Sequence, residues 1–311
     1  MSKLREGIRH LSKGNTRSLN LKKAHISSVD FSGLDLHGSS FSQAHLANCS
    51  FIGTNLTDSD LIGARINSCD FVGSDAYRAN FTKAVISSSS FSHADLRGAY
   101  FVEAHFRDTD FMGAVLYDCL MWNADLSGAQ HIRQNNFKNL ESKKIRPNYR
   151  LSEKNIHGAY ESYRTLKHYF YHNGLYEAGS WAARRELTME RKHFFEKRDA
   201  RYFPSLLMDV LSGYTEKPDR VILSSLVIVL LFGALYYFLN VPIAVSKGSS
   251  MPASFWDSIY FSFITFTTVG YGDFVPRAVL WFRLLVCAEA FSGPFMAGLY
   301  IFTLTRRYAA S

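Results

Sequence analysis

An apolar residue recurs at every fifth position through the first part of the chain. The series runs from Leu21 to Leu126 without a break, and Ala76 is the weakest of its 22 members. A helix repeats every 3.6 residues and a strand every two, so neither keeps a five-residue register over this length. The pattern therefore predicts a solenoid of short repeats.

A second period of twenty residues lies over the first. It is carried by the phenylalanines Phe31, Phe51, Phe71, Phe91 and Phe111. Four five-residue repeats would make one square coil that rises by about 4.8 Å, the spacing of neighbouring strands, so that these rings would stack. Residues 21–130 thus resemble the pentapeptide-repeat family, whose members form a right-handed quadrilateral β-helix.

Small residues stand two positions before most of the apolar ones and should also point inward. Cys49, Cys69 and Cys119 fall on this small position. Their place in the pattern favours packing in the core over a redox role.

Different patterns flank the repeats. Residues 1–20 contain a one-sided apolar stretch, Lys3 to Lys13, which predicts a helical N-terminal cap over the first coil. Residues 131–220 lose the five-residue register, and Leu175 to Arg198 is rich in Glu, Ala, Arg and Lys. We expect an α-helical linker there, and both a coupling role and a passive spacer role remain open.

The last ninety residues are strongly apolar. Val221 to Leu239 holds 19 residues without a charge, close to the roughly 20 that a bilayer core requires, and Ala278 to Thr305 is a second such stretch. Between them, Ser254 to Phe266 is aromatic but only about a dozen residues long, the length of a re-entrant half-helix. Residues 221–311 are therefore expected to form an all-α membrane domain with two spans.

The segment that follows the half-helix reads TTVGYGD, from Thr267 to Asp273. Rings of backbone carbonyls from several chains can replace the hydration shell of K⁺. Those carbonyls must all face one axis, whereas an ordinary strand alternates them. Every second residue must then tolerate a left-handed conformation, which Gly270 and Gly272 supply. The stretch is similar to the signature of the potassium-channel pore family, and the resemblance covers residues 221–307.

The resemblance implies roles for individual residues. The expected filter residues, which bind K⁺ through backbone carbonyls at the first four, are Thr268, Val269, Gly270, Tyr271 and Gly272. The expected supports of the filter are Thr267, Asp273, Tyr260 and Phe261, and Tyr260, Phe261 and Tyr271 would form an aromatic cuff. The half-helix would become a re-entrant pore helix whose C-terminal dipole favours a cation. A gating hinge is expected at Gly293 and Pro294, and the subunits would assemble as a homotetramer.

One position departs from the family pattern, and one ionisable residue within the second span has two possible roles. Ile264 stands where relatives often carry a carboxylate behind the filter, so a bond from that position to Asp273 is not expected. Glu289 lies inside the second span, and intramembrane ionisable groups are functional by default. We favour a structural role, with Arg283 or a backbone donor of the half-helix as its partner, over a gating role.

Charge adds an orientation. The chain carries a net charge of +8, and residues 131–220 hold 18 basic and 11 acidic side chains, a placement that fits anionic lipid headgroups and not nucleic acid. Basic residues flank the outer ends of the two spans, namely Arg201, Lys217, Arg220, Arg306 and Arg307. With no apolar leader at the start, these flanks predict a multi-pass protein of the cell membrane with both termini in the cytoplasm.

The sequence is compatible with three functions. The favoured one is a K⁺-selective channel without a cofactor, whose cytoplasmic β-helix regulates the pore or binds a cytoplasmic protein. A membrane-tethered scaffold is the second, because some pentapeptide-repeat proteins mimic DNA and bind topoisomerases, and residues 21–130 hold 12 acidic against 7 basic side chains. A cation channel without selectivity is the third. No nucleophile with a base and no phosphate-binding loop is legible, so an enzyme is not expected.

Overall fold

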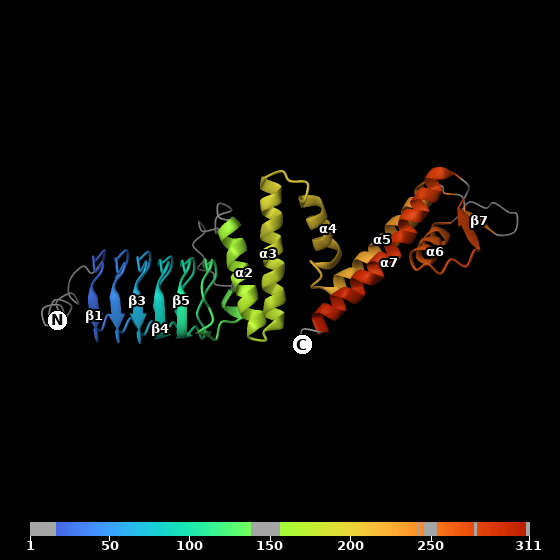
Figure 1. Cartoon of the computed structure of the whole chain (residues 1–311). Helices are drawn as coiled ribbons and strands as arrows, with labels where there is room; N and C mark the ends of the chain where they lie inside the picture. Colours follow the sequence, from blue (N-terminus) through green and yellow to red (C-terminus); the bar gives the residue numbers. More distant parts are fainter. Residues whose placement is uncertain are drawn as a thin grey trace. The chain divides into compact units, whose positions relative to one another are not determined.

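The protein divides into two compact units, Met1–Lys197 and Arg198–Ser311 (Figure 1). The structure, a computed structural model, describes residues 17–137, 156–239, 241, 243–245, 254–276 and 279–308. The predicted N-terminal cap, Lys3 to Lys13, lies outside these residues. The helices expected in residues 131–220 are shared between the two units.

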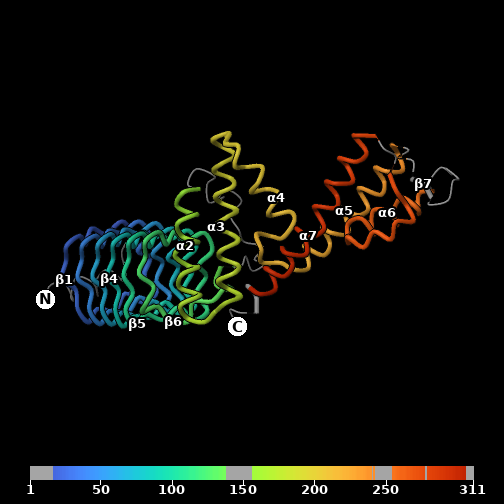
Figure 2. The backbone as a smooth tube through the Cα atoms, turned by 45° about the vertical axis from the view of Figure 1, so that its right-hand side comes forward, coloured from blue at the N-terminus to red at the C-terminus, as the bar shows by residue number. Residues whose placement is uncertain are grey.

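The first unit is a stack of coils (Figure 2). Its strands pair in parallel and in sequence order, and they are β1 (His25–Ser27), β2 (His45–Ala47), β3 (Arg65–Asn67), β4 (Val85–Ser90), β5 (His105–Asp110) and β6 (Ala129–Gln130). The register is 20 residues throughout, as in the pair His25 and His45. Parallel bridges with the same offset define three more sides, at Asn20, Asp30 and Asp35. Each coil therefore has four sides, and the predicted β-solenoid is confirmed.

The apolar fifth positions form the core of this solenoid. Its phenylalanine rings stack from coil to coil, with centroids 4.9 Å apart for Phe31 and Phe51 and 4.7 Å apart for Phe51 and Phe71. The same column continues through Phe91 to Phe111. The cysteines on the small position, Cys49, Cys69 and Cys119, are buried and free. Packing thus explains both periods of the sequence.

The corners of the coils are turns whose acceptors come from the sequence itself. The carboxylate of Asp70 accepts the backbone N–H of Val72 at 2.9 Å, and Gly73 follows with φ +62°. The same bond to the amide two residues later is made by Asp30, Asp35, Asp60, Asp75, Asp95, Asp110 and Asp125. These aspartates therefore close turns in the way that Asx residues commonly do.

The last coil is covered by a helical hairpin, α2 (Ile156–His172) and α3 (Tyr176–Glu196), which follows the short 3₁₀ helix η1 (Gln134–Phe137). The hydroxyl of Ser162 accepts the buried N–H of Met121 at 2.9 Å, and the hydroxyl of Tyr169 donates to the carbonyl of Ala129 at 2.9 Å. Phe170 is fully buried in the solenoid core. Without such a cover, the last coil would expose unpaired backbone groups.

The second unit contains α4 (Tyr202–Ser212), α5 (Pro218–Phe238), α6 (Phe255–Phe266) and α7 (Leu280–Tyr308), with β7 (Ile243–Val245) pairing antiparallel to β8 (Phe274–Pro276). Helices α5 and α7 are long and apolar enough to cross a membrane, so they are candidate spans at the two predicted positions. Helix α6 begins at the capping box of Ser254 and Asp257, at the predicted start of the half-helix.

Candidate functional site

The TTVGYGD segment leaves the C-terminus of α6 with an alternating backbone. The angle φ is positive at Thr268 (57°), Gly270 (49°) and Gly272 (77°), and it is not positive at the residues between them. Such alternation turns successive peptide groups to the same side. The left-handed conformation expected at the two glycines is present, and it extends to Thr268, which the sequence did not indicate.

The amide groups of this segment face α6. The N–H groups of Val269 and Gly270 both donate to the carbonyl of Ile264, at 3.0 and 3.2 Å. The carbonyl groups of Thr268 and Val269, which share peptide planes with these two amides, therefore point away from α6, and the segment itself is exposed in the single chain. This arrangement leaves the carbonyl oxygens of Thr268 and Val269 available to a cation.

Two of the expected filter supports are in contact. The hydroxyl of Tyr260 donates to Asp273 at 2.9 Å, and the Tyr260 ring packs against Phe274 with centroids 5.6 Å apart. Tyr260, on α6, thus ties the far end of the segment back to the helix. As expected, Ile264 makes no such bond, and it packs in an apolar cluster.

The other expected supports of the filter make different contacts. Phe261 is buried and packs on the ring of Tyr236, with centroids 5.3 Å apart, whereas Tyr271 is 73% exposed. Among the described residues of this chain, no ring contact joins Tyr260, Phe261 and Tyr271. Thr267 caps the C-terminus of α6, and its hydroxyl donates to the carbonyl of Phe263.

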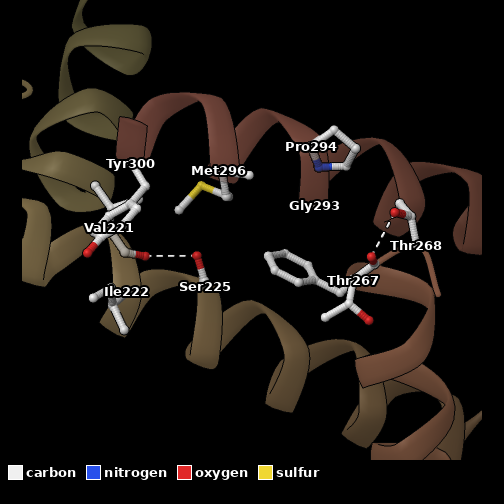
Figure 3. Close-up of a pocket in the computed structure, with 11 residues that line it drawn as sticks. Val221, Ile222, Ser225, Thr267, Thr268, Gly293, Pro294, Met296 and Tyr300 are labelled. Carbon is white, nitrogen blue, oxygen red and sulfur yellow. Dashed lines mark hydrogen bonds between the residues drawn. The ribbon is translucent and has the colours of Figure 1, made fainter. Parts of the chain in front are cut away.

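A cavity of about 530 Å³ opens at the C-terminal end of α6 (Figure 3). Thr267 and Thr268 line one end of it, and Val221 and Tyr300 lie at the other, with Met296 between them. The negative end of the α6 dipole faces this space, which favours a cation there.

Glycine allows α6 and α7 to touch. A Cβ atom built on Gly293 would lie 1.8 Å from the carbonyl oxygen of Phe266, the last residue of α6. Helix α7 runs without interruption through Gly293 and Pro294. The structure thus shows a close contact at the expected hinge position, and the hinge itself stays a prediction.

Glu289 is fully buried between three helices. Its carboxyl group meets the hydroxyl of Tyr236 on α5, at 2.5 Å, and the hydroxyl of Ser262 on α6. Arg283 is exposed, so the expected pairing with it is wrong, and α6 contributes a side chain where we expected a backbone donor. The sequence analysis missed Tyr236 and Ser262, and their polar groups within apolar helices were the signal that could have found them.

Comparison with known proteins adds the family context. The "Ion channel" family matches residues 224–310, the "Pentapeptide repeat region" family matches residues 24–101, and "Pentapeptide repeats (8 copies)" matches residues 89–128. Neither kind of family is an enzyme family. The chain is also 52% identical over 42 residues to "Two-pore potassium channel 1" of Arabidopsis thaliana, a match that covers 14% of this chain and 11% of the relative.

Solved structures of pentapeptide repeat proteins are similar to part of the chain. The pentapeptide repeat protein Rfr23 from the cyanobacterium Cyanothece 51142 shares 18% identity over 39% of this chain and 98% of its own, with a TM-score of 0.28. HetL from Nostoc sp. strain PCC 7120 shares 16% over 40% and 94%, with a TM-score of 0.16. Because these TM-scores are low, the assignment of a solenoid fold is based on the strand pairing within this chain. The chain therefore carries pentapeptide repeats followed by an ion channel region that is similar in sequence to a potassium channel.

Proposed function

We propose that this chain is one subunit of a homotetrameric, K⁺-selective channel. The observation that carries the proposal is the alternating backbone of TTVGYGD, in which the amides of Val269 and Gly270 face α6 and the carbonyls of Thr268 and Val269 point away from it. Four copies would place the carbonyl oxygens of Thr268, Val269, Gly270 and Tyr271 around one axis, with Gly272 completing the turn. Such oxygens replace the hydration shell of K⁺.

The remaining elements support the same function. Helices α5 and α7 would span the cell membrane, α6 would enter it from one side as a re-entrant pore helix, and both termini would be cytoplasmic. The basic residues before α5 and in its first turn, which are Arg201, Lys217 and Arg220, support this orientation. The aromatic cuff would form between neighbouring subunits, since Tyr271 is exposed within one chain.

The solenoid supports a scaffold role less well. Its acidic character was the reason to consider mimicry of DNA, but the aspartates at its corners accept turn amides, as Asp70 and Asp95 do. Their carboxylates therefore have a structural explanation. A cytoplasmic protein that binds the solenoid is compatible with the channel, and we propose regulation of the pore as the role of such binding.

The test is ion flux into liposomes that contain the full-length protein. Wild-type protein should pass K⁺ and exclude Na⁺. The change Gly270→Ala should abolish the K⁺ flux, because an alanine is strained in a backbone with φ +49°. A Cβ atom at this position meets nothing within 4 Å in the chain, so a steric clash within the subunit is not the cause. K⁺ flux that survives this change would contradict the channel proposal. Equal passage of Na⁺ and K⁺ through the wild-type protein would favour a cation channel without selectivity.

A further inference from the structure

Glu289 is a buried carboxyl group that conduction through TTVGYGD does not use. It lies on α7 with none of its surface exposed, and its two oxygens have separate partners. Oε2 meets the hydroxyl of Tyr236 and Oε1 meets the hydroxyl of Ser262. Three helices, α5, α6 and α7, therefore contribute to one polar cluster.

The number of protons in this cluster determines the state of Glu289. The hydroxyl oxygen of Ser262 lies 2.7 Å from the carbonyl oxygen of Val229 and also within hydrogen-bonding distance of Glu289 Oε1. A serine hydroxyl has one proton to donate. If Glu289 were ionised, both of these partners would be acceptors, and one of the two contacts would hold two oxygens without a proton between them.

The charges nearby also disfavour an ionised Glu289. A buried carboxylate without a cation is strongly disfavoured. Arg283, on the same helix, is exposed and forms no described ion pair with Glu289. The charged residues of α5 and α6, which are Asp219, Arg220 and Asp257, lie in the first turns of those helices. Tyr236 is the titratable group that faces Glu289, and it can supply a hydrogen bond but no positive charge.

We infer that Glu289 is a neutral carboxylic acid that joins the three helices as both donor and acceptor. Its Oε1–H donates to the Ser262 hydroxyl, the Ser262 hydroxyl donates to the Val229 carbonyl, and the Tyr236 hydroxyl donates to Oε2. Every polar atom of the cluster then has a matched partner. Because α6 leads directly into TTVGYGD, Glu289 acts as a positioning residue for that segment.

Infrared spectroscopy of the full-length protein in liposomes tests the proton directly, independently of ion selectivity. The difference spectrum between wild type and Glu289→Gln should show the loss of a protonated carboxyl C=O stretch. Tyr236→Phe, which keeps the ring packing, should shift that stretch because it removes the donor to Oε2. Loss of the paired bands of a carboxylate in either spectrum would overturn the inference.

Substitutions test the positioning role, and this readout alone rests on the proposed channel function. Gln can donate to Ser262 and accept from Tyr236, so Glu289→Gln should keep the tetramer and the K⁺ flux. Glu289→Ala removes both contacts and should lose them, whereas Glu103→Gln on the solenoid surface is a neutral control. If Glu289→Gln disrupts the tetramer as severely as Glu289→Ala, the neutral acid is the wrong assignment.

Discussion

At the scale of single residues, the packing of the second unit depends on glycines, which have no Cβ atom. Gly293 lets the carbonyl of Phe266 approach α7, and Gly233 likewise admits Ile259 of α6 against α5, where a Cβ would meet the Ile259 side chain at 2.5 Å. Helix α6 is thus held between two helices that each make room for it with a glycine.

This contact gives a first prediction. Gly293→Ala should disrupt the packing of α6 against α7 and cost about 1–3 kcal/mol or more, as overpacking usually does. Size-exclusion chromatography of the assembled protein and liposome flux would both report the loss. Gly298→Ala, in the same helix, is the matched control, because a Cβ there meets nothing within 4 Å and alanine favours a helix by up to about 1 kcal/mol.

Pro294→Ala separates packing from bending at the same position. This change leaves the contact between Gly293 and Phe266 unaltered, and it restores the backbone N–H that proline lacks. If Gly293→Ala were fully active while Pro294→Ala changed channel opening, the hinge and not the contact would be the role of this site.

A second prediction concerns the aspartates that close the solenoid turns. The pKa of Asp30 lies below its usual range because the hydroxyl and then the amide of Ser32 donate to its carboxylate. Ser127 lowers the pKa of Asp125 in the same way. A carboxyl group whose folded pKa is depressed stabilises the fold above its unfolded pKa, near 4, and this contribution is lost as pH falls through the folded value.

We therefore expect the thermal midpoint of the solenoid, followed by circular dichroism, to fall as pH is lowered below about 4. The double variant Asp30→Asn and Asp125→Asn keeps an oxygen acceptor at each turn but has no proton to gain. Its midpoint should fall less over the same pH range. An equal fall in the two proteins would show that these carboxylates do not contribute.

At the scale of elements, α2 acts as the end cover of the solenoid, and this gives a third prediction. Ser162→Ala would leave the buried N–H of Met121 without a partner, which costs about 1–3 kcal/mol. Hydrogen exchange of the last coil should become faster. Thr165→Ala is the control on the same helix, because the Thr165 hydroxyl donates only to the Glu161 carbonyl of α2 itself. Equal exchange in both variants would contradict the role of Ser162.

The elements also show what the sequence could and could not predict. The periods of five and twenty follow from local repetition, and the structure reproduces them. The two long apolar helices and the short helix between them follow from local hydropathy and length, and the structure contains these helices. Contacts between distant segments do not follow from such patterns. Glu289 meets Tyr236, 53 residues away, whereas the sequence suggested the nearby Arg283. The pair Gly293 and Pro294 suggested a bend in the helix. The close contact of Gly293 with Phe266 could not be predicted from the sequence, because it exists only after α6 and α7 have packed.

At the scale of the whole molecule, the contacts described above for TTVGYGD and for α6, which leads into it, lie within Arg198–Ser311. Tyr260 with Asp273, Gly293 with Phe266, and the Glu289 cluster belong to this unit. The solenoid and its helical cover form a separate unit with its own core. Selectivity and any regulation by the solenoid should therefore be separable.

A fourth prediction follows. A protein that begins near Tyr202 should keep the same preference of K⁺ over Na⁺ as the full-length chain, measured by current in planar bilayers. A difference in the fraction of time spent open would assign regulation to the solenoid, and identical behaviour would exclude it as a gate. A loss of selectivity on truncation would contradict the independence of the second unit.

The uniform register of the coils has a consequence for how this protein can change in evolution. An insertion of twenty residues would add one step of about 4.8 Å and leave the last coil against its cover of α2 and α3. An insertion of five would move every later side by a quarter turn and break the columns of rings. Whole coils of twenty residues are therefore the units in which the solenoid can be lengthened or shortened without changing how its last coil packs under α2.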